Sequence, residues 1–145
     1  MAPSPTRRAT TAPLRVLGID PGTRRLGWGV VERHGAKVAA VAAGVLKLSE
    51  KDALEVRLEQ VHRALGEVIE TYAPSALAVE DIFYAEFAAA AIKLGHVRGV
   101  VLLVGAQRSL EIASYAPALV KRTIAGRGAA EKVQVARLVA ATLGL

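Results

Sequence analysis

The chain has 145 residues, 52% of them hydrophobic, which favours one folded domain and argues against two domains or a disordered chain. It contains no cysteine, which excludes disulfides and thiolate metal sites and leaves carboxylates and histidines as metal ligands. Its formal net charge of +6 suits an anionic partner, nucleic acid first, unless the basicity serves only solubility.

Residues 1–13 are rich in Ser, Thr, Pro and Arg and have no apolar segment, so they do not have the pattern of a secretory signal. We expect them to form a disordered tail and residues 14–145 to form the folded domain. No unbroken apolar run reaches the roughly 18 residues that span a bilayer, so the expected location is the cytoplasm.

The first apolar run, Leu14–Asp20, ends on an aspartate. A Pro-Gly pair follows, and Arg25–Arg33 reads as a second strand, which predicts a tight hairpin with a carboxylate at its mouth. A charge at the end of a buried strand needs water, a cation or hydrogen-bond donors. Asp20 therefore either closes an Asx-turn onto the backbone two or three residues on, or takes part in metal or phosphate chemistry.

A third strand, Lys37–Leu48, completes an antiparallel meander. Asp52 is the expected N-cap of the next helix, with Glu55 three residues later completing a capping box. Apolar residues then recur every three or four positions as far as Ile69, which predicts an amphipathic helix that ends near Tyr72.

A short strand, Ser75–Val79, follows this helix, and Glu80 stands at its end as Asp20 stands at the end of the first strand. A strand, helix and strand in this order predict a crossover to a parallel strand. If the two strands are neighbours, both carboxylates emerge at one edge of the sheet, where open α/β sheets bind ligands. Two carboxylates about 5 Å apart repel each other, and a divalent cation between them relieves that repulsion. This arrangement favours the metal role for Asp20.

Asp81 and two aromatic residues, Phe83 and Tyr84, follow Glu80. Neighbouring strand residues point to opposite faces, so we expect Asp81 to be solvated rather than a third ligand. The aromatic side chains either pack locally or form a platform on which an unpaired base stacks.

The next helix is expected at Phe87–Arg108, with Ala91, Gly95 and Gly99 spaced four apart on one face. Small residues at that spacing allow close backbone approach, either to the sheet or to a second subunit. A fifth strand is expected at Glu111–Tyr115.

Two more helices are expected, from Pro117 to about Thr123 and from Ala129 to Leu143. They bring together basic residues that read either as a phosphate-contacting surface or as an ordinary solvated face: Lys121, Arg122, Arg127 and Lys132. Together these elements predict an α/β fold with a mixed five-stranded sheet, strands one to three antiparallel and strands four and five parallel, flanked by helices.

Five segments in order resemble the RuvC family of Holliday-junction resolvases: LGIDPGT at 17–23, AVEDIF at 78–83, KLGHVRG at 93–99, VKRTIAG at 120–126 and AEKVQV at 130–135. The resemblance implies a ribonuclease-H-like fold and a homodimer that makes paired nicks in four-way DNA junctions in recombination and repair. It implies Mg²⁺ as cofactor, with Mn²⁺ as a substitute and two ions per site in the complete protein. It also implies cooperation with the RuvA–RuvB branch-migration complex.

By the same resemblance, Asp20 and Glu80 are metal-binding catalytic carboxylates. Phe83 matches an aromatic near the unpaired bases of the junction, and Lys121 and Lys132 match basic residues near the scissile strand. The family's third acidic cluster, Asp-Ala-Ala-Asp on a last helix, has no match here, because Glu131 is the only acid after Gly128. We therefore expect the chain to lack that helix, to leave apolar sheet surface uncovered, and to bind junctions but cut them poorly.

The sequence leaves three other functions open. The actin and sugar-kinase ATPases share the hairpin pattern Gly-Ile-Asp-x-Gly-Thr, but they need a second such domain. A non-catalytic junction-binding module fits the missing acidic cluster, whereas the retained Asp20 and Glu80 favour an enzyme. A ribonuclease-H-like nuclease that acts on RNA is the third, against which Phe83 and the lysines argue.

Overall fold

The computed structural model describes residues 13–81 and 88–116. The expectations for Phe83, Tyr84, the two last helices and their basic residues lie outside the described residues. The described elements, in chain order, are β1 (Leu14–Asp20), β2 (Arg25–His34), β3 (Lys37–Lys47), α1 (Leu54–Tyr72), β4 (Ala76–Glu80), α2 (Ala88–Gln107) and β5 (Glu111–Tyr115).

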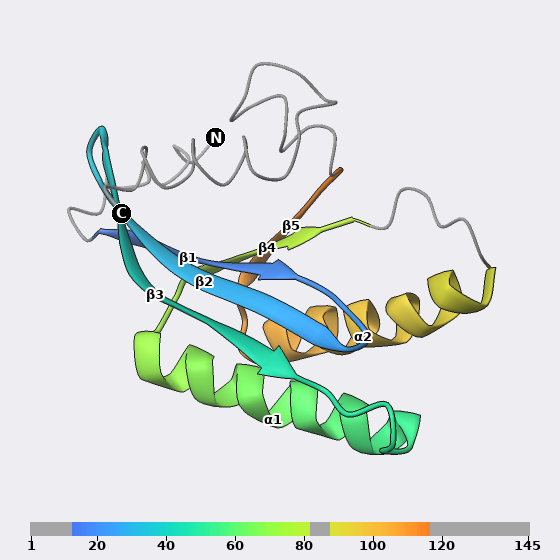
Figure 1. The fold of residues 1–145 in the computed structure, drawn as a ribbon. Coiled ribbons are helices and arrows are strands. Elements are labelled where there is room, and N and C mark those ends of the chain that lie inside the picture. The colour runs from blue at the N-terminus through green and yellow to red at the C-terminus, as the bar shows by residue number, and fades with distance from the viewer. Residues whose placement is uncertain (1–12, 82–87, 117–145) are drawn as a thin grey trace, which may run out of the picture.

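The five strands form one sheet in the order β3-β2-β1-β4-β5. β1 pairs antiparallel with β2 and parallel with β4, while β2–β3 is antiparallel and β4–β5 parallel. This is the mixed sheet that the sequence predicted, with the crossover from β1 to β4 confirmed. Within the described part of the chain, α1 and α2 lie side by side on the same side of the sheet (Figure 1).

Alternation along the strands assigns each residue to a face of the sheet. Leu17 and Ile19 of β1 are buried, as are their partners on the neighbouring strands, Val30, Leu77 and Val79. These residues meet the helices, and because successive strand residues point to opposite faces, Gly18 and Asp20 face the other way. We call that other side the open face.

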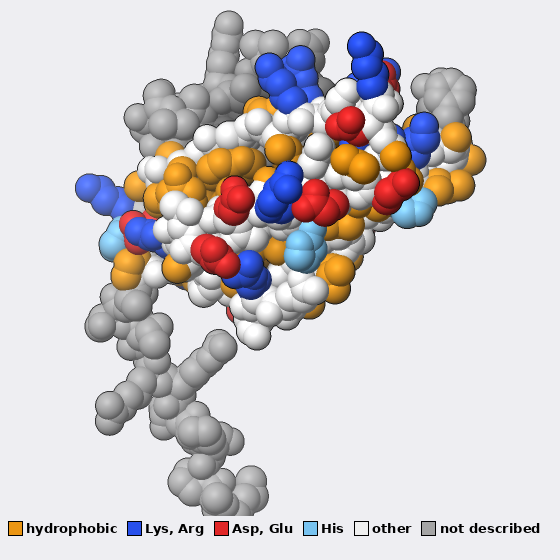
Figure 2. Space-filling view, turned by 90° about the horizontal axis from the view of Figure 1, so that it is seen from below, with side chains coloured by type: hydrophobic (Ala, Val, Ile, Leu, Met, Phe, Trp, Pro, Cys, Tyr) orange, Lys and Arg blue, Asp and Glu red, His pale blue; other side chains and the backbone are white. Residues whose placement is uncertain are grey.

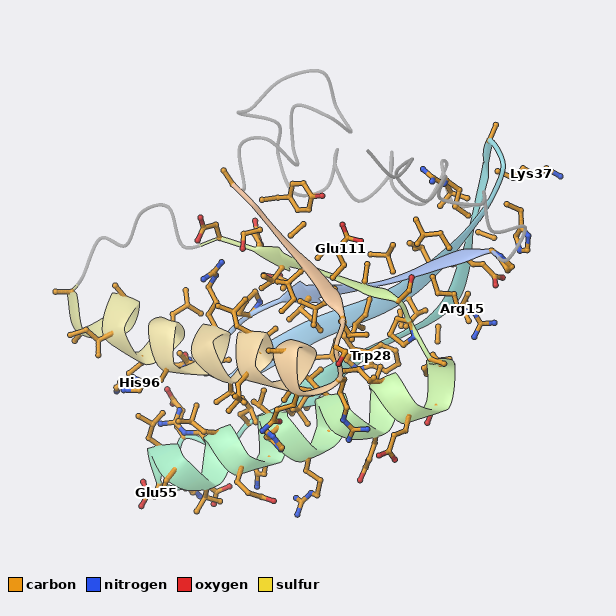
Figure 3. All side chains as sticks on the ribbon, turned by 180° about the vertical axis from the view of Figure 1, so that it is seen from behind. Arg15, Trp28, Lys37, Glu55, His96 and Glu111 are labelled. Carbon is orange, nitrogen blue, oxygen red and sulfur yellow. The ribbon has the colours of Figure 1, made fainter. Side chains whose placement is uncertain are left out.

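Each helix turns an apolar stripe to the sheet. Val61, Leu65 and Ile69 of α1 are buried at the three- and four-residue spacing that the sequence showed. In α2 the buried side chains include Val97, Val101 and Val104. Trp28 of β2 lies between the sheet and the end of α1, with its ring centroid 5.9 Å from that of Tyr72 (Figure 3).

The predicted capping box at the start of α1 is wrong. The helix begins at Leu54 with Ala53 at the N-cap, and no side chain caps it. Asp52 lies one residue too early to cap, and its Oδ2 accepts a weak 3.5 Å hydrogen bond from Gln60 instead. Glu55 keeps a favourable place, since an acid in the first turn complements the helix dipole.

The predicted end of α1 is confirmed. Ala73 takes a left-handed conformation with φ of 48°, and its N–H donates to the Ile69 carbonyl at 2.8 Å. Pro74 follows, which prevents further helix. Arg15 then ties this end to the sheet, since its Nη1 donates to the Tyr72 carbonyl at 2.8 Å.

A charged cluster connects β1 and β2 at the end of the sheet away from Asp20. Arg15 and Glu32 are cross-strand partners whose Nε and Oε1 are 3.1 Å apart, and His34 lies 3.1 Å from the other oxygen of Glu32. Hydrogen bonds from His34 and then Arg15 hold the pKa of Glu32 below its ordinary value. Cross-strand charge pairs of this kind support the register of the hairpin.

α2 is apolar enough to be compared with a membrane span. It has 20 residues and a mean hydropathy of 1.5, so by length and composition alone it could cross a membrane. The sequence did not indicate this, because no unbroken apolar run in it is long enough. A single helix of this kind is weak evidence for a membrane span. α2 packs three buried valines against the sheet, and 22% of its most apolar window is buried. Seen from the helix side, acidic and basic side chains lie interspersed among apolar ones (Figure 2).

Leucine truncations on β1 test this division of faces. Leu17→Ala should lower the free energy of unfolding by about 2–5 kcal/mol, because Leu17 is fully buried and its loss leaves a cavity. Leu14→Ala on the same strand, where the side chain is 38% exposed, should cost less than about 1 kcal/mol. Urea denaturation followed by circular dichroism measures both, and equal losses would contradict the assigned core.

Candidate active site

Two carboxylates stand side by side where β1 and β4 end. The parallel register pairs Ile19 with Val79, so continuing it by one residue sets Asp20 beside Glu80. Neighbouring strands lie about 4.8 Å apart, and both side chains project from the open face. The structure thus brings together the two acids that the sequence had placed at one edge.

Small residues surround this pair. Gly27 of β2 is the register partner of Asp20. Two residues before Asp20 on β1, Gly18 pairs with both Gly29 and Ala78. They help line a pocket of about 460 Å³ that Asp20, Glu80 and Tyr115 also line. Because these side chains are so short, none of them rises above the carboxylates on this part of the described surface.

Hydrogen bonds from outside the turn, and not an Asx-turn, hold the residues that follow Asp20. In the described part of the chain, no hydrogen bond links the exposed Asp20 carboxylate to the backbone of Gly22 or Thr23. Leu48 instead donates its N–H to the Arg24 carbonyl at 2.8 Å, and Arg57 donates to the Thr23 carbonyl at 3.3 Å. The carboxylate of Asp20 is therefore not used to build the turn.

Asp81 turns away from the carboxylate pair. Its Oδ1 lies 3.4 Å from Nη2 of Arg98 on α2, and the same nitrogen donates to Ser114 Oγ at 2.6 Å. The Asp81 N–H donates to the Tyr115 carbonyl at 2.7 Å, which extends the β4–β5 pairing. The sequence expectation that Asp81 points away from Glu80 is confirmed, but the side chain is ion-paired rather than only solvated.

The chemistry of Asp20 and Glu80 fits a hard divalent cation, because Mg²⁺ prefers carboxylate and water oxygens. Residues 13–81 and 88–116 contain no group of three or more His, Asp or Glu side chains able to hold a metal. Among the described residues, these two carboxylates are therefore the oxygen ligands that this edge of the sheet offers to such a cation. The geometry leaves the other coordination positions to water, to a phosphate oxygen or to further ligands.

Substitution of Gly27 tests the closeness of β2 to this pair. A Cβ at Gly27 would lie 3.7 Å from the Asp20 Cβ, which is ordinary contact, so Gly27→Ala should bind Mn²⁺ as the parent chain does. Gly27→Leu should crowd the carboxylate and weaken Mn²⁺ binding by roughly tenfold, the size of effect seen when groups around a metal are disturbed. Isothermal calorimetry measures both, and equal affinities would contradict this geometry.

Comparison with known proteins adds the evolutionary relationship. The family model described as "Crossover junction endodeoxyribonuclease RuvC" matches residues 16–145. The RuvC of Sorangium cellulosum is 52% identical over 132 residues, covering 91% of this chain and 74% of that protein. The RuvC of Azorhizobium caulinodans is 42% identical over 134 residues, and the match covers 92% of this chain and 79% of that protein.

Solved structures agree with the fold. Thermus thermophilus RuvC in complex with a Holliday junction substrate superposes with a TM-score of 0.85 at 36% identity, covering 91% of this chain and 81% of that one. The yeast mitochondrial Holliday junction resolvase shares the fold at 17% identity, with a TM-score of 0.66 over 90% of this chain and 62% of its own. The match to the RuvC model over residues 16–145, nearly the whole chain, shows that this chain belongs to the RuvC family of crossover junction endodeoxyribonucleases.

Proposed function

We propose that this chain resolves four-way DNA junctions by metal-dependent hydrolysis of phosphodiester bonds, with Asp20 and Glu80 as the catalytic, metal-binding carboxylates. The observation that carries the proposal is their adjacency at the ends of paired parallel strands, on the open face of the sheet. The 36% identity to a RuvC that was solved with a Holliday junction supports DNA as the substrate.

The residues around the pair define its chemistry. The Asp20 and Glu80 carboxylates bind and orient the cation, and the short side chains behind them admit the scissile strand. Asp20 and Glu80 would hold Mg²⁺, with two ions in the complete site and Mn²⁺ as a substitute, and the bound metal would supply activation of a water and stabilisation of the leaving oxygen. Rigid strands hold both carboxylates, which gives the site the preorganisation that phosphoryl chemistry needs.

The remaining assignments complete the DNA interface. We propose that Phe83 stacks on an unpaired base and that four basic residues contact phosphates: Lys121, Arg122, Arg127 and Lys132. A cytoplasmic location and cooperation with RuvA–RuvB belong to the same proposal. None of the three alternatives from the sequence is favoured. The match to an endodeoxyribonuclease family argues against an ATPase and an RNA nuclease, and the paired carboxylates argue against a purely non-catalytic module.

A homodimer is also part of the proposal, and the structure offers a face for it. Gly95 and Gly99 have nothing within 4 Å of a Cβ built on them, so within the described chain they do not approach the sheet. They share the outer side of α2 with Ile92, 62% exposed, and Leu103, 50% exposed. An apolar, low-relief stripe of this kind suits a two-fold pairing of α2 with its copy.

Removing either carboxylate tests the catalytic proposal. Asp20→Asn and Glu80→Gln should each lower the Mg²⁺-dependent cleavage of a labelled four-way junction by about 100-fold, because a neutral amide holds the cation poorly. Junction affinity in a gel-shift assay should change by less than about threefold, since neither group is proposed to contact DNA except through the metal.

Glu59→Gln on the exposed side of α1 is the matched control and should cut as the parent chain does. Undiminished cleavage by both carboxylate variants would contradict the proposal that Asp20 and Glu80 are catalytic. Junction binding without Mg²⁺-dependent cleavage by the parent chain would contradict the catalytic proposal and leave only junction binding. Preference for plain duplex or RNA over the junction would contradict the function itself.

Charge placed on the outer side of α2 tests the dimer. Leu103→Glu should shift the chain from dimer to monomer by light scattering after size exclusion, because two carboxylates would face each other across the two-fold axis without partners. Val56→Glu on α1, where the side chain is 43% exposed, is the control and should stay dimeric. A parent chain that is monomeric, or a dimeric Leu103→Glu, would contradict this face.

A further inference from the structure

A second pocket lies beside the turn that joins β1 and β2. It has a volume of about 450 Å³ and is lined by Thr23 and Arg24 of the turn, Glu50 before α1, Arg57 in α1, Lys93 in α2 and two alanines at the start of α2. Its size is in the range of ligand pockets, roughly 300–1,000 Å³. Its lining comes from three separate parts of the chain, so the fold and not a local run of basic residues creates it.

The charges around this pocket do not balance. Three cations face one acid, and that acid is engaged, because Glu50 Oε1 accepts from Arg24 Nε at 2.6 Å. For Arg57 and Lys93, the described residues provide no carboxylate within ion-pairing distance. The pocket therefore carries positive charge that is available to an anion from outside.

Arg57 distinguishes this pocket from an ordinary basic surface. Only 8% of it is exposed, and its Nε is fully buried without a hydrogen-bond partner among the described residues. Among the described residues, its side chain makes one hydrogen bond, the 3.3 Å donation from Nη1 to the Thr23 carbonyl. Burying a guanidinium without an acid is costly, and an anion bound in the pocket would offset that cost.

We propose that this pocket binds a backbone phosphate of the junction DNA, close to the scissile bond. This inference rests on the proposed function and adds a contact that it does not contain. Arginine's planar fork suits phosphate oxygens, and Lys93 supplies a second positive charge. The start of α2, whose dipole favours anions, lines the same pocket.

The position favours DNA over free phosphate as the occupant. Thr23 follows Asp20 by three residues, so their Cα atoms are within about 11 Å of each other even if the chain is extended. That span corresponds to about three base-pair rises of duplex DNA. A strand that crosses Asp20 and Glu80 on the open face would meet the pocket within this span if it continued around the same edge of the sheet.

The test compares two lysines in junction binding, with EDTA present so that no DNA is cut. Lys93→Gln should weaken binding about fivefold and make the slope of log affinity against log salt less negative by about 1, the value for one lost phosphate contact. Lys37→Gln at the β2–β3 turn is the matched control, since it removes the same charge at the other end of the sheet (Figure 3). It should leave affinity and slope unchanged.

Arg57→Gln provides a second variant, with folding checked by circular dichroism, and should show the same loss of slope. If it does not fold, Lys93→Gln still decides the question. In the parent chain, junction DNA should shift the NMR signals of the Thr23 amide and the Arg57 Nε–H at concentrations where inorganic phosphate has no effect.

The outcomes separate this inference from the proposed function. A parent chain that binds junctions, with Lys93→Gln equal to it in affinity and slope, would overturn the phosphate pocket alone. Signals that respond to inorganic phosphate but not to junction DNA would likewise show that the pocket holds another anion. A parent chain that binds no junction would overturn both.

Discussion

The parallel pairing of β1 with β4 is the constraint on which the rest of the structure depends. The pairing fixes the register, and the register decides that Asp20 and Glu80 stand together and not several residues apart. Parallel strands need a long crossover, and α1 provides it while covering the sheet. A slip of one residue along this pair would send one carboxylate into the core and one apolar side chain out of it. The hydrophobic alternation that stabilises the sheet therefore also specifies the site.

The two faces of the sheet have different roles: one forms the hydrophobic core and the other carries the two carboxylates. The face toward α1 and α2 is filled with branched apolar side chains, while the open face near the carboxylates carries Gly18, Gly27, Gly29 and Ala78. None of these three glycines has a positive φ or a neighbour that forbids a Cβ, so backbone strain does not explain them. Access explains them under the proposed function, because larger side chains there would obstruct the approach of a nucleic acid strand to the carboxylates.

Much of this arrangement was predictable because it is written in local patterns. Strand alternation, helix periodicity and the Pro-Gly turn predicted the five strands, the two described helices and the shared edge of Asp20 and Glu80. The start of α1 was mispredicted because a capping box is a short pattern that several register choices satisfy, and here Ala53 took the N-cap position. The environment of Asp81 was also only half foreseen, since the ion pair with Arg98 joins residues 17 apart in sequence.

Long-range features explain what the sequence did not reveal. Arg57 looks like an ordinary polar member of an amphipathic helix, since it sits between Leu54 and Leu58 with no motif around it. The fold brings its guanidinium to the Thr23 carbonyl in the β1–β2 turn. Among the described residues no carboxylate pairs with it, and its Nε has no hydrogen-bond partner. The sequence likewise left open which way the small residues of α2 faced, because helical spacing defines a stripe but not its direction.

Arg57 also links α1, which packs on the sheet, to the turn that follows Asp20. Its backbone belongs to the helix that packs on the sheet, while its guanidinium supports the carbonyl of Thr23 in the turn that follows Asp20. A phosphate bound to Arg57 would therefore also affect the position of the turn that follows Asp20, because Arg57 hydrogen-bonds to that turn. Substrate binding at the edge and alignment of the metal ligand are then not independent, because one buried cation takes part in both.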